Sequence, residues 1–237
     1  MKALKWLLFK SKLFRNTIHK SNEEIHKQKL REISDHLRIV KNELIRLLPT
    51  QMWQRFEEEA YVSGGCIYSL YHDKKPKDYD FFLVNQSFVD ELREFFIDRA
   101  GYHGSDMSGG VYDDLPLLIT NNAISIGKYQ IITQWVGEPN EVIQEFDFKH
   151  NMYYWKNNKV KATSDWMYLK GNALVYNEQR ARDIVGTIIR VPRFIQRGMT
   201  ITQKEMSKVL LKLHKVGFNE KEIEILESNK ADRHFRS

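Results

Sequence analysis

Two glycines and two aspartates carry the residue types and spacing that point most directly to chemistry. Gly64 and Gly65 follow a short apolar stretch, and Asp80 lies fifteen residues after Gly65, with Asp78 two residues before it. Residues 79–84 are rich in aromatic and β-branched side chains, which predicts a strand. Because side chains two apart on a strand share a face, both carboxylates should project together. Paired carboxylates predict a Mg²⁺ site that carries a triphosphate.

The glycine pair has a matching interpretation. Bare backbone N–H groups at a strand-to-helix junction let phosphate oxygens approach closely. A Gly-Gly pair alone is usually a turn, and an Asp-x-Asp pair alone is common on surface strands. Their joint occurrence, with a predicted helix at 66–72 and a loop at 74–77 between them, favours a nucleotide site.

The surrounding elements follow from periodicity and turn residues. Apolar residues recur at helical spacing from Ile25 to Leu48, Asn22 or Ser21 is a plausible N-cap, and Pro49 ends the pattern. Residues 1–20 predict a separate basic amphipathic helix that packs on the protein, lies on a membrane surface or contacts nucleic acid. Further helices are predicted at 50–59, 87–99, 139–144, 203–215 and 219–228, with helical spacing resuming from 178. Strands are predicted at 60–63, 123–126, 129–134 and 146–154, and a loop at 101–110.

The segment from Ser63 to Asp80 resembles the DNA polymerase β-like nucleotidyltransferase superfamily, nearest to the heads of poly(A) polymerases and CCA-adding enzymes. Seven positions match that family's pattern without a gap: Gly64, Gly65, Leu70, Pro76, Lys77, Asp78 and Asp80. The family's Arg-Asp pair is replaced by Tyr68 and Ser69, and its usual glycine by Asp73. The resemblance is strong at 61–82 and loose over the rest of 60–200. It implies two Mg²⁺ ions, with Mn²⁺ as a substitute, held by the aspartates. It also implies nucleotide binding by Ser63, Gly64, Gly65 and Lys77.

The same resemblance implies a third carboxylate between two apolar residues on a neighbouring strand. Asp147 between Phe146 and Phe148 is the best match. An acid flanked by phenylalanines on a core strand is costly to bury unless it binds something. Glu145 is the second choice, followed by Asp113 or Asp114. Asp147 is alternatively an exposed edge-strand residue.

An arginine-rich segment follows the predicted head. Arg190, Arg193 and Arg197 stand at helical spacing, although Pro192 interrupts them. The resemblance implies that Arg190 and Arg193 contact the nucleotide or support the junction between the head and the helices behind it.

Composition limits the setting without fixing the partner. Residues 1–50 hold 12 Lys and Arg against 5 Asp and Glu, and residues 190–237 hold 11 against 6, so two basic flanks enclose an acidic centre. Basic flanks attract polyanions, but Lys-rich helices also occur merely as soluble surfaces. Cys66 is the only cysteine, which excludes an internal disulfide and a cysteine-based zinc site. No membrane span or secretory signal is expected, and the expected location is the cytoplasm.

These patterns together predict an α+β protein with a mixed-sheet nucleotidyltransferase head at 58–160. Basic helices at 1–57 precede the head, and a helical region at 161–237 follows it. The predicted reaction transfers a nucleoside monophosphate from a nucleoside triphosphate to a hydroxyl, with RNA, for example a tRNA 3′ end, as the expected acceptor. Modification of a protein hydroxyl, or an inactive head that binds nucleic acid, are the alternatives. The oligomeric state is left open.

Overall fold

The sheet is mixed, as expected for an α+β protein. The computed structural model describes residues 2–102 and 107–227, and within them the side chains of 21–100, 108–220, 222–224 and 226–227. In this part of the chain nine strands form one sheet in the order β3-β4-β5-β6-β7-β2-β1-β8-β9. The central strands β2 and β7 run parallel, and the other neighbours are antiparallel. The strands are β1 (Tyr61–Ser63), β2 (Tyr79–Phe82), β3 (Gly101–Tyr102), β4 (Met107–Tyr112), β5 (Leu115–Thr120), β6 (Ala123–Ile126), β7 (Tyr129–Ile132), β8 (Tyr153–Lys156) and β9 (Lys159–Ala162).

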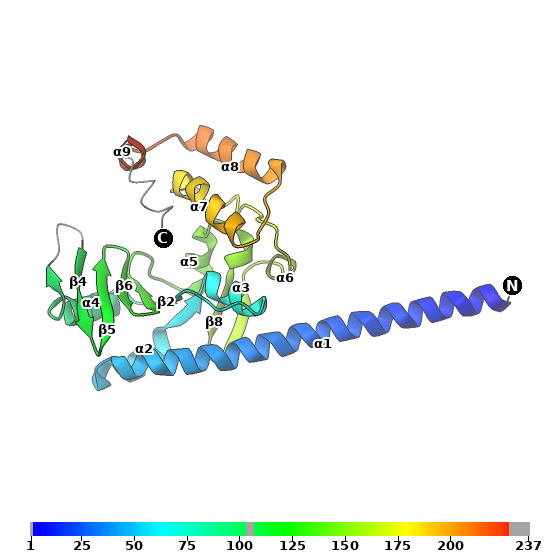
Figure 1. The fold of residues 1–237 in the computed structure, drawn as a ribbon, viewed down its shortest axis with the longest axis horizontal. Coiled ribbons are helices and arrows are strands. Elements are labelled where there is room, and N and C mark those ends of the chain that lie inside the picture. Colours follow the sequence, from blue (N-terminus) through cyan, green and yellow to red (C-terminus); the bar gives the residue numbers. More distant parts are fainter. Residues whose placement is uncertain (1, 103–106, 228–237) are drawn as a thin grey trace.

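A single long helix, α1 (Lys2–Leu47), replaces the two N-terminal helices that we predicted. The proposed caps Ser21 and Asn22 lie inside it. Its C-terminal half is fixed to the sheet by buried side chains, among them Leu37 and Leu44, whereas its N-terminal half extends beyond the rest of the molecule (Figure 1). Among the described residues, none of the helices combines the length and apolar character needed to cross a bilayer.

The remaining helices are short and surround the sheet. They are α2 (Trp53–Glu59), α3 (Gly65–Tyr71), α4 (Gln86–Ile97), α5 (Pro139–Val142), α6 (Met167–Lys170), α7 (Ile184–Gln196), α8 (Gln203–Val216) and α9 (Glu220–Glu227), with 3₁₀ turns η1 (Thr50–Met52), η2 (Ile143–Glu145) and η3 (Lys149–Asn151). In Figure 1, α7 and α8 lie on the opposite side of the molecule from α1. The division at 57 and 160 remains a prediction.

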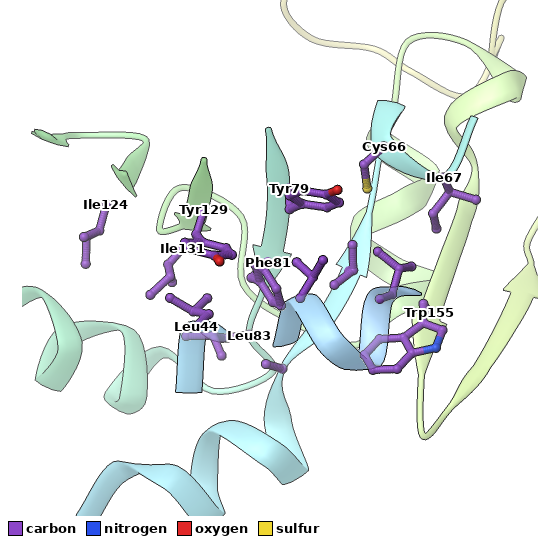
Figure 2. Close-up of a cluster of buried hydrophobic side chains, with 14 of the residues drawn as sticks. Leu44, Cys66, Ile67, Tyr79, Phe81, Leu83, Ile124, Tyr129, Ile131 and Trp155 are labelled. Atoms are coloured by element: carbon purple, nitrogen blue, oxygen red, sulfur yellow. The ribbon is translucent and has the colours of Figure 1, made fainter. Parts of the chain in front are cut away.

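The two faces of the central strands are buried in different cores. Val62, Phe81 and Ile131 point to one face, where they pack with Leu44 of α1 and Trp155 of β8 (Figure 2). The alternate residues point to the other face. There a smaller cluster forms from Tyr61, Phe82, Phe146 and Tyr154, together with Val142, Ile143 and Met152. This alternation fixes which face of the sheet carries Asp80.

Two further predicted elements are wrong. The expected loop at 101–110 contains strands β3 and the start of β4 within its described part, because β4 pairs with β5 along six residues. The expected strand at 146–154 is mostly irregular. Phe148 makes one isolated bridge with Tyr176, the turn η3 follows, and β8 begins only at Tyr153.

Candidate active site

The glycine turn and Asp80 are built against each other. β1 ends at Ser63, Gly64 adopts φ +90°, and α3 begins at Gly65. A Cβ atom on Gly64 would lie 3.1 Å from the Asp80 Oδ2 atom, and its φ value is one that side-chain-bearing residues rarely adopt. Gly64 is therefore required both by the turn and by the close approach of the carboxylate.

The predicted carboxylate pair lies beside this turn. Asp78 directly precedes β2 and Asp80 is its second residue. In the sheet Asp80 is opposite Ser63 of β1 on one side and Gln130 of β7 on the other. The Ser63 hydroxyl donates to the Tyr153 carbonyl at 2.7 Å, so it contributes to the sheet in this structure.

The charge of Asp80 is poorly accommodated in the free protein. Burial, and then the nearby negative charge of Asp78, raise the pKa of Asp80 from 3.8 to about 7. Cys66 lies close to this pair. Burial and then the charge of Asp80 raise the pKa of its thiol, so this cysteine is inert as a nucleophile. A cation between the two carboxylates would relieve the repulsion.

A cavity of about 300 Å³ opens at this point. Its wall includes Asp78 and Gly65, and the loop Lys74–Lys77 brings three lysines to it. The remaining lining comes from α3, η3 and the end of α7: Cys66, Tyr68, Ser69, His150, Asn151, Phe194, Arg197 and Met199. Asp78 lines this cavity and Asp80 does not, so the cavity offers one carboxylate beside a basic loop, an arrangement suited to a phosphate-bearing ligand that carries a cation.

Asp147 does not join this pair. Arg190 Nε and Nη2 donate to its two oxygens at 2.6 and 3.0 Å, Arg180 Nε lies 2.8 Å from Oδ1, and the Thr187 hydroxyl donates to Oδ1 at 2.7 Å. Among the described residues, no three His, Cys, Asp or Glu side chains come close enough to hold a metal ion. In this structure Asp147 is paired with two arginines and is not gathered with Asp78 and Asp80, and its role as a metal ligand stays a prediction. Asp147 instead ties the loop before η3 to α7.

The two other candidates for a third carboxylate also lie elsewhere. Glu145 forms an ion pair with Arg182 at 3.0 Å. Asp113 and Asp114 make the tight turn between β4 and β5, both with positive φ. None of them reaches the cavity beside Asp78.

Gln130 is the site residue that the sequence analysis missed. It faces Asp80 across the parallel pair β2–β7, so both side chains lie on the same face of the sheet. It also lies between Tyr129 and Ile131. A polar residue between two apolar ones is the pattern that is expected of the third carboxylate. The signal was present, but Gln130 carries a neutral amide rather than a carboxylate.

The predicted basic residues have different surroundings. Lys77 is exposed and lines the cavity. Arg190 is committed to Asp147 and to Asp183, which its Nη2 contacts at 2.8 Å. Arg193 is partly buried in α7. Only Arg197 of this arginine group lines the cavity.

A comparison with models of protein families shows the family to which the chain belongs. The model described as "Gad2: Gabija anti-defense 2 family protein" matches residues 20–180, about two thirds of the chain. The chain belongs to the Gad2 family. The region shared with Gad2 proteins contains the glycine turn, both carboxylates, Gln130 and Asp147, and it ends before α7 begins.

Solved structures similar to this Gad2-family chain are CCA-adding enzymes. The Thermotoga maritima CCA-adding enzyme complexed with tRNA is 14% identical, with 73% of this chain and 44% of that one covered at a TM-score of 0.46. The Bacillus stearothermophilus CCA-adding enzyme in complex with CTP is 15% identical, with coverages of 70% and 42% and a TM-score of 0.48. The chain thus spans less than half the length of these enzymes, and the likeness decides neither activity nor substrate. No curated protein matches the chain in sequence.

Proposed function

We propose that this Gad2-family chain is a metal-dependent nucleotidyltransferase. A hydroxyl oxygen of the acceptor would attack the α-phosphorus of a nucleoside triphosphate. A new O–P bond forms, the bond to the β-phosphate oxygen breaks, pyrophosphate leaves, and the hydroxyl proton passes to solvent or a nearby base. The observation that carries the proposal is Asp80 set against the Gly64 turn, together with Asp78, which lines a cavity that three lysines also line.

The carboxylate pair fits a divalent cation. Asp78 and Asp80 are hard oxygen ligands, and burial together with the charge of Asp78 raises the pKa of Asp80, an effect that a bound cation would oppose. A bound Mg²⁺ or Mn²⁺ would supply charge neutralisation for the triphosphate. Asp147 is already paired with Arg180 and Arg190, and Gln130 carries no charge. Asp78 and Asp80 alone would therefore hold one cation. A second would depend on the phosphates of the nucleotide.

The chain's own groups would orient the nucleotide. Backbone amides at Gly64 and Gly65 are unobstructed by side chains and would contact the phosphates. Lys77 makes no hydrogen bond or ion pair with any residue that the structure describes, so its ammonium group is available to the same anion. The buried wall at Cys66 would exclude water from one side.

RNA is the acceptor that we favour, because lysines also line a second cavity next to the first. This cavity, of about 680 Å³, lies between α1 and the loop 74–77, and its basic residues are Lys29, Lys74, Lys75, Lys77 and Lys128. Lys29 and Lys128 are ion-paired with Asp73 and Glu43, so a polyanion would pass to the cleft mainly along the lysines of the loop 74–77. The arginine-rich segment that begins at Arg190 is a weaker candidate for binding RNA, because Arg190 is already paired with Asp147 and Asp183.

The family description adds a biological direction. Gad2 proteins are named for activity against Gabija, and we infer that nucleotidyl transfer serves that activity here. A protein hydroxyl remains the alternative acceptor. A head that binds nucleotide without transfer is a second candidate, favoured by Gln130 at the position facing Asp80 and by the engagement of Asp147.

The test is transfer from each α-labelled nucleoside triphosphate with Mg²⁺, to total RNA and, separately, to Gabija proteins. Wild type is compared with Asp80→Asn and with Asp90→Asn, a matched change on the exposed face of α4. We expect label in RNA with wild type and Asp90→Asn only. Label in protein alone would mean that the acceptor is a protein hydroxyl and not RNA. Tight nucleotide binding without transfer to either acceptor would mean that the chain binds nucleotide but is not a transferase.

RNA affinity measured against salt tests the basic surface. Each neutralised phosphate of a single strand contributes roughly −0.7 to the slope of log affinity against log salt. The double variant Lys75→Gln/Lys77→Gln should flatten the slope by about 1.4, and an unchanged slope would remove this surface from the acceptor path. Loss of counter-defence by Asp80→Asn, in cells that carry Gabija, would link the chemistry to the family's role.

A further inference from the structure

The loop 74–77 lies between two cavities. Its four residues line both the first cavity, which contains Asp78, and the second cavity of about 680 Å³. Pro76 within the loop is buried, whereas Lys75 and Lys77 on either side of it are exposed. The other walls differ, because η3 and α7 contribute only to the first cavity and α1 only to the second. The two cavities are therefore neighbours that share the lysines of one loop.

The second cavity carries an excess of positive charge. Five lysines line it against only two acidic residues, Glu32 and Asp73. Asp73 is paired with Lys29 at 2.7 Å. Lys75 and Lys77 make no hydrogen bond or ion pair with any residue that the structure describes. Ammonium groups alone can therefore hold an anion here, whereas the first cavity has a carboxylate in its wall and calls for a cation beside the anion.

The inner part of the second cavity is apolar. Ile33 of α1 and Tyr79 of β2 line it and are almost fully buried, with 3% and 5% of their surface exposed. Leu70 of α3 lies in the same lining. The Tyr79 hydroxyl and the His36 Nε2 atom are 2.7 Å apart, so each satisfies the other. An apolar interior beneath exposed cations suits a small molecule that has an aromatic body and a phosphate group, and sites for such molecules are usually about 300–1,000 Å³ in volume.

We propose that the second cavity binds a small phosphate ester, about the size of a mononucleotide, without a metal ion, and that this ligand opposes nucleotide binding in the first cavity. The binding site stands apart from the proposed function, whereas the opposition rests on it. Lys75 and Lys77 can contact an anion on either side of the loop, and ammonium groups that contact one anion are less available to the other.

Lys74 extends the connection between the cavities. Its Nζ atom donates to the Arg197 carbonyl at 3.0 Å, which joins the loop to the end of α7 in the wall of the first cavity. A ligand that displaces the loop from one side therefore also changes the other side. Coupling between two sites is reciprocal, so each ligand should weaken the binding of the other by the same factor.

The first experiment is calorimetric titration of AMP, and separately of inorganic phosphate, into the wild-type chain in the presence of a chelator. AMP should bind about tenfold more tightly than phosphate, the effect of burying about 50 Å² of its base. His36→Glu places a carboxylate in the second cavity and not in the first, and should weaken AMP binding by at least about fivefold. His214→Glu, the same change at an exposed position of α8, is the control and should bind AMP as wild type does.

The second experiment measures the affinity for ATP with Mg²⁺, with and without AMP. AMP should weaken ATP binding by at least about fivefold in wild type. The same concentration of AMP should have little effect in His36→Glu, whose affinity for ATP with Mg²⁺ should equal that of wild type. Equal opposition in both proteins would mean that AMP competes directly in the first cavity, and would overturn the coupling.

Two further outcomes would overturn the second site and leave the nucleotide site untouched. One is an absence of AMP binding in the chelator, and the other is equal binding by wild type and His36→Glu. Should His36→Glu fail to fold, Lys128→Gln tests the same cavity by removing one of its cations, and it should also weaken AMP binding.

A short single-stranded RNA distinguishes the cavity from the path of the acceptor. An RNA tetramer that binds in the chelator, loses affinity in His36→Glu and leaves ATP binding unaffected would assign the cavity to RNA, and would overturn the proposal of a small opposing ligand. If AMP binds as expected but ATP with Mg²⁺ does not bind at all, the second site stands and the proposed function is wrong.

Discussion

Asp80 should destabilise the metal-free protein at neutral and alkaline pH. Its pKa is about 7 in the folded chain against an ordinary value of 3.8, and each tenfold change in proton affinity corresponds to about 1.36 kcal/mol. A carboxyl group with a raised pKa leaves folding unaffected well below 3.8, and lowers stability progressively as the pH rises to 7. Its full cost is therefore about 4 kcal/mol at about pH 8. Asp80→Asn, which has no charge to bury, should be more stable by about 2–4 kcal/mol there.

The assay is urea unfolding in the presence of a chelator at two pH values. The cost of the Asp80 charge should be complete at about pH 8 and small at about pH 4. Mg²⁺ should then stabilise wild type at the higher pH and leave Asp80→Asn unchanged. Asp90→Asn, on the exposed face of α4, serves as the control and should shift neither midpoint. An Asp80→Asn protein that is less stable at the higher pH, or a gain of the same size at both, would refute the reasoning.

Three further predictions concern the neighbours of this site. Asp147→Asn should cost about 1.5–3 kcal/mol in urea unfolding, because the buried Arg180 would lose one of its two charged partners and keep only Asp183. A loss below about 1 kcal/mol would contradict the bracing role. Gly64→Ala should cost about 1–3 kcal/mol and weaken nucleotide binding, since its φ is +90° and a Cβ would crowd Asp80. Gly65→Ala, whose Cβ would meet open space, is its control, and equal effects of the two would count against the turn geometry. Gln130→Glu should raise Mg²⁺ affinity by about tenfold, and unchanged calorimetric affinity would mean that Gln130 does not face the cation.

Local patterns predicted the elements that hold the carboxylate pair. The alternation around Asp78 and Asp80, the glycine turn and the hairpin at 123–134 depend on neighbouring residues, and the structure has them where the sequence placed them. The continuity of α1 was missed, because Ser21 and Asn22 are good caps in isolation but nothing near them breaks a helix.

Distant partners explain the other misses. Phe146 and Phe148 alternate around Asp147 as in a strand, yet they belong to two different cores. The donors to Asp147 come from 33 to 43 residues further along the chain, beyond the reach of local patterns. Strand β4 holds two glycines and reads as a loop, but pairing with β5 imposes the extended conformation. Gln130 could be recognised only once the parallel pairing of β2 with β7 placed it opposite Asp80.

The central claim is that Asp78 and Asp80 hold a cation that carries a triphosphate beside Gly64 and Gly65. The most direct measurement is a crystal structure with Mn²⁺ and a non-hydrolysable nucleoside triphosphate, recorded at a wavelength where manganese scatters anomalously. The account predicts an anomalous peak in direct contact with both carboxylates, and phosphates over the glycine turn. Nucleotide density elsewhere, or a peak that leaves Asp80 uncoordinated, would contradict it.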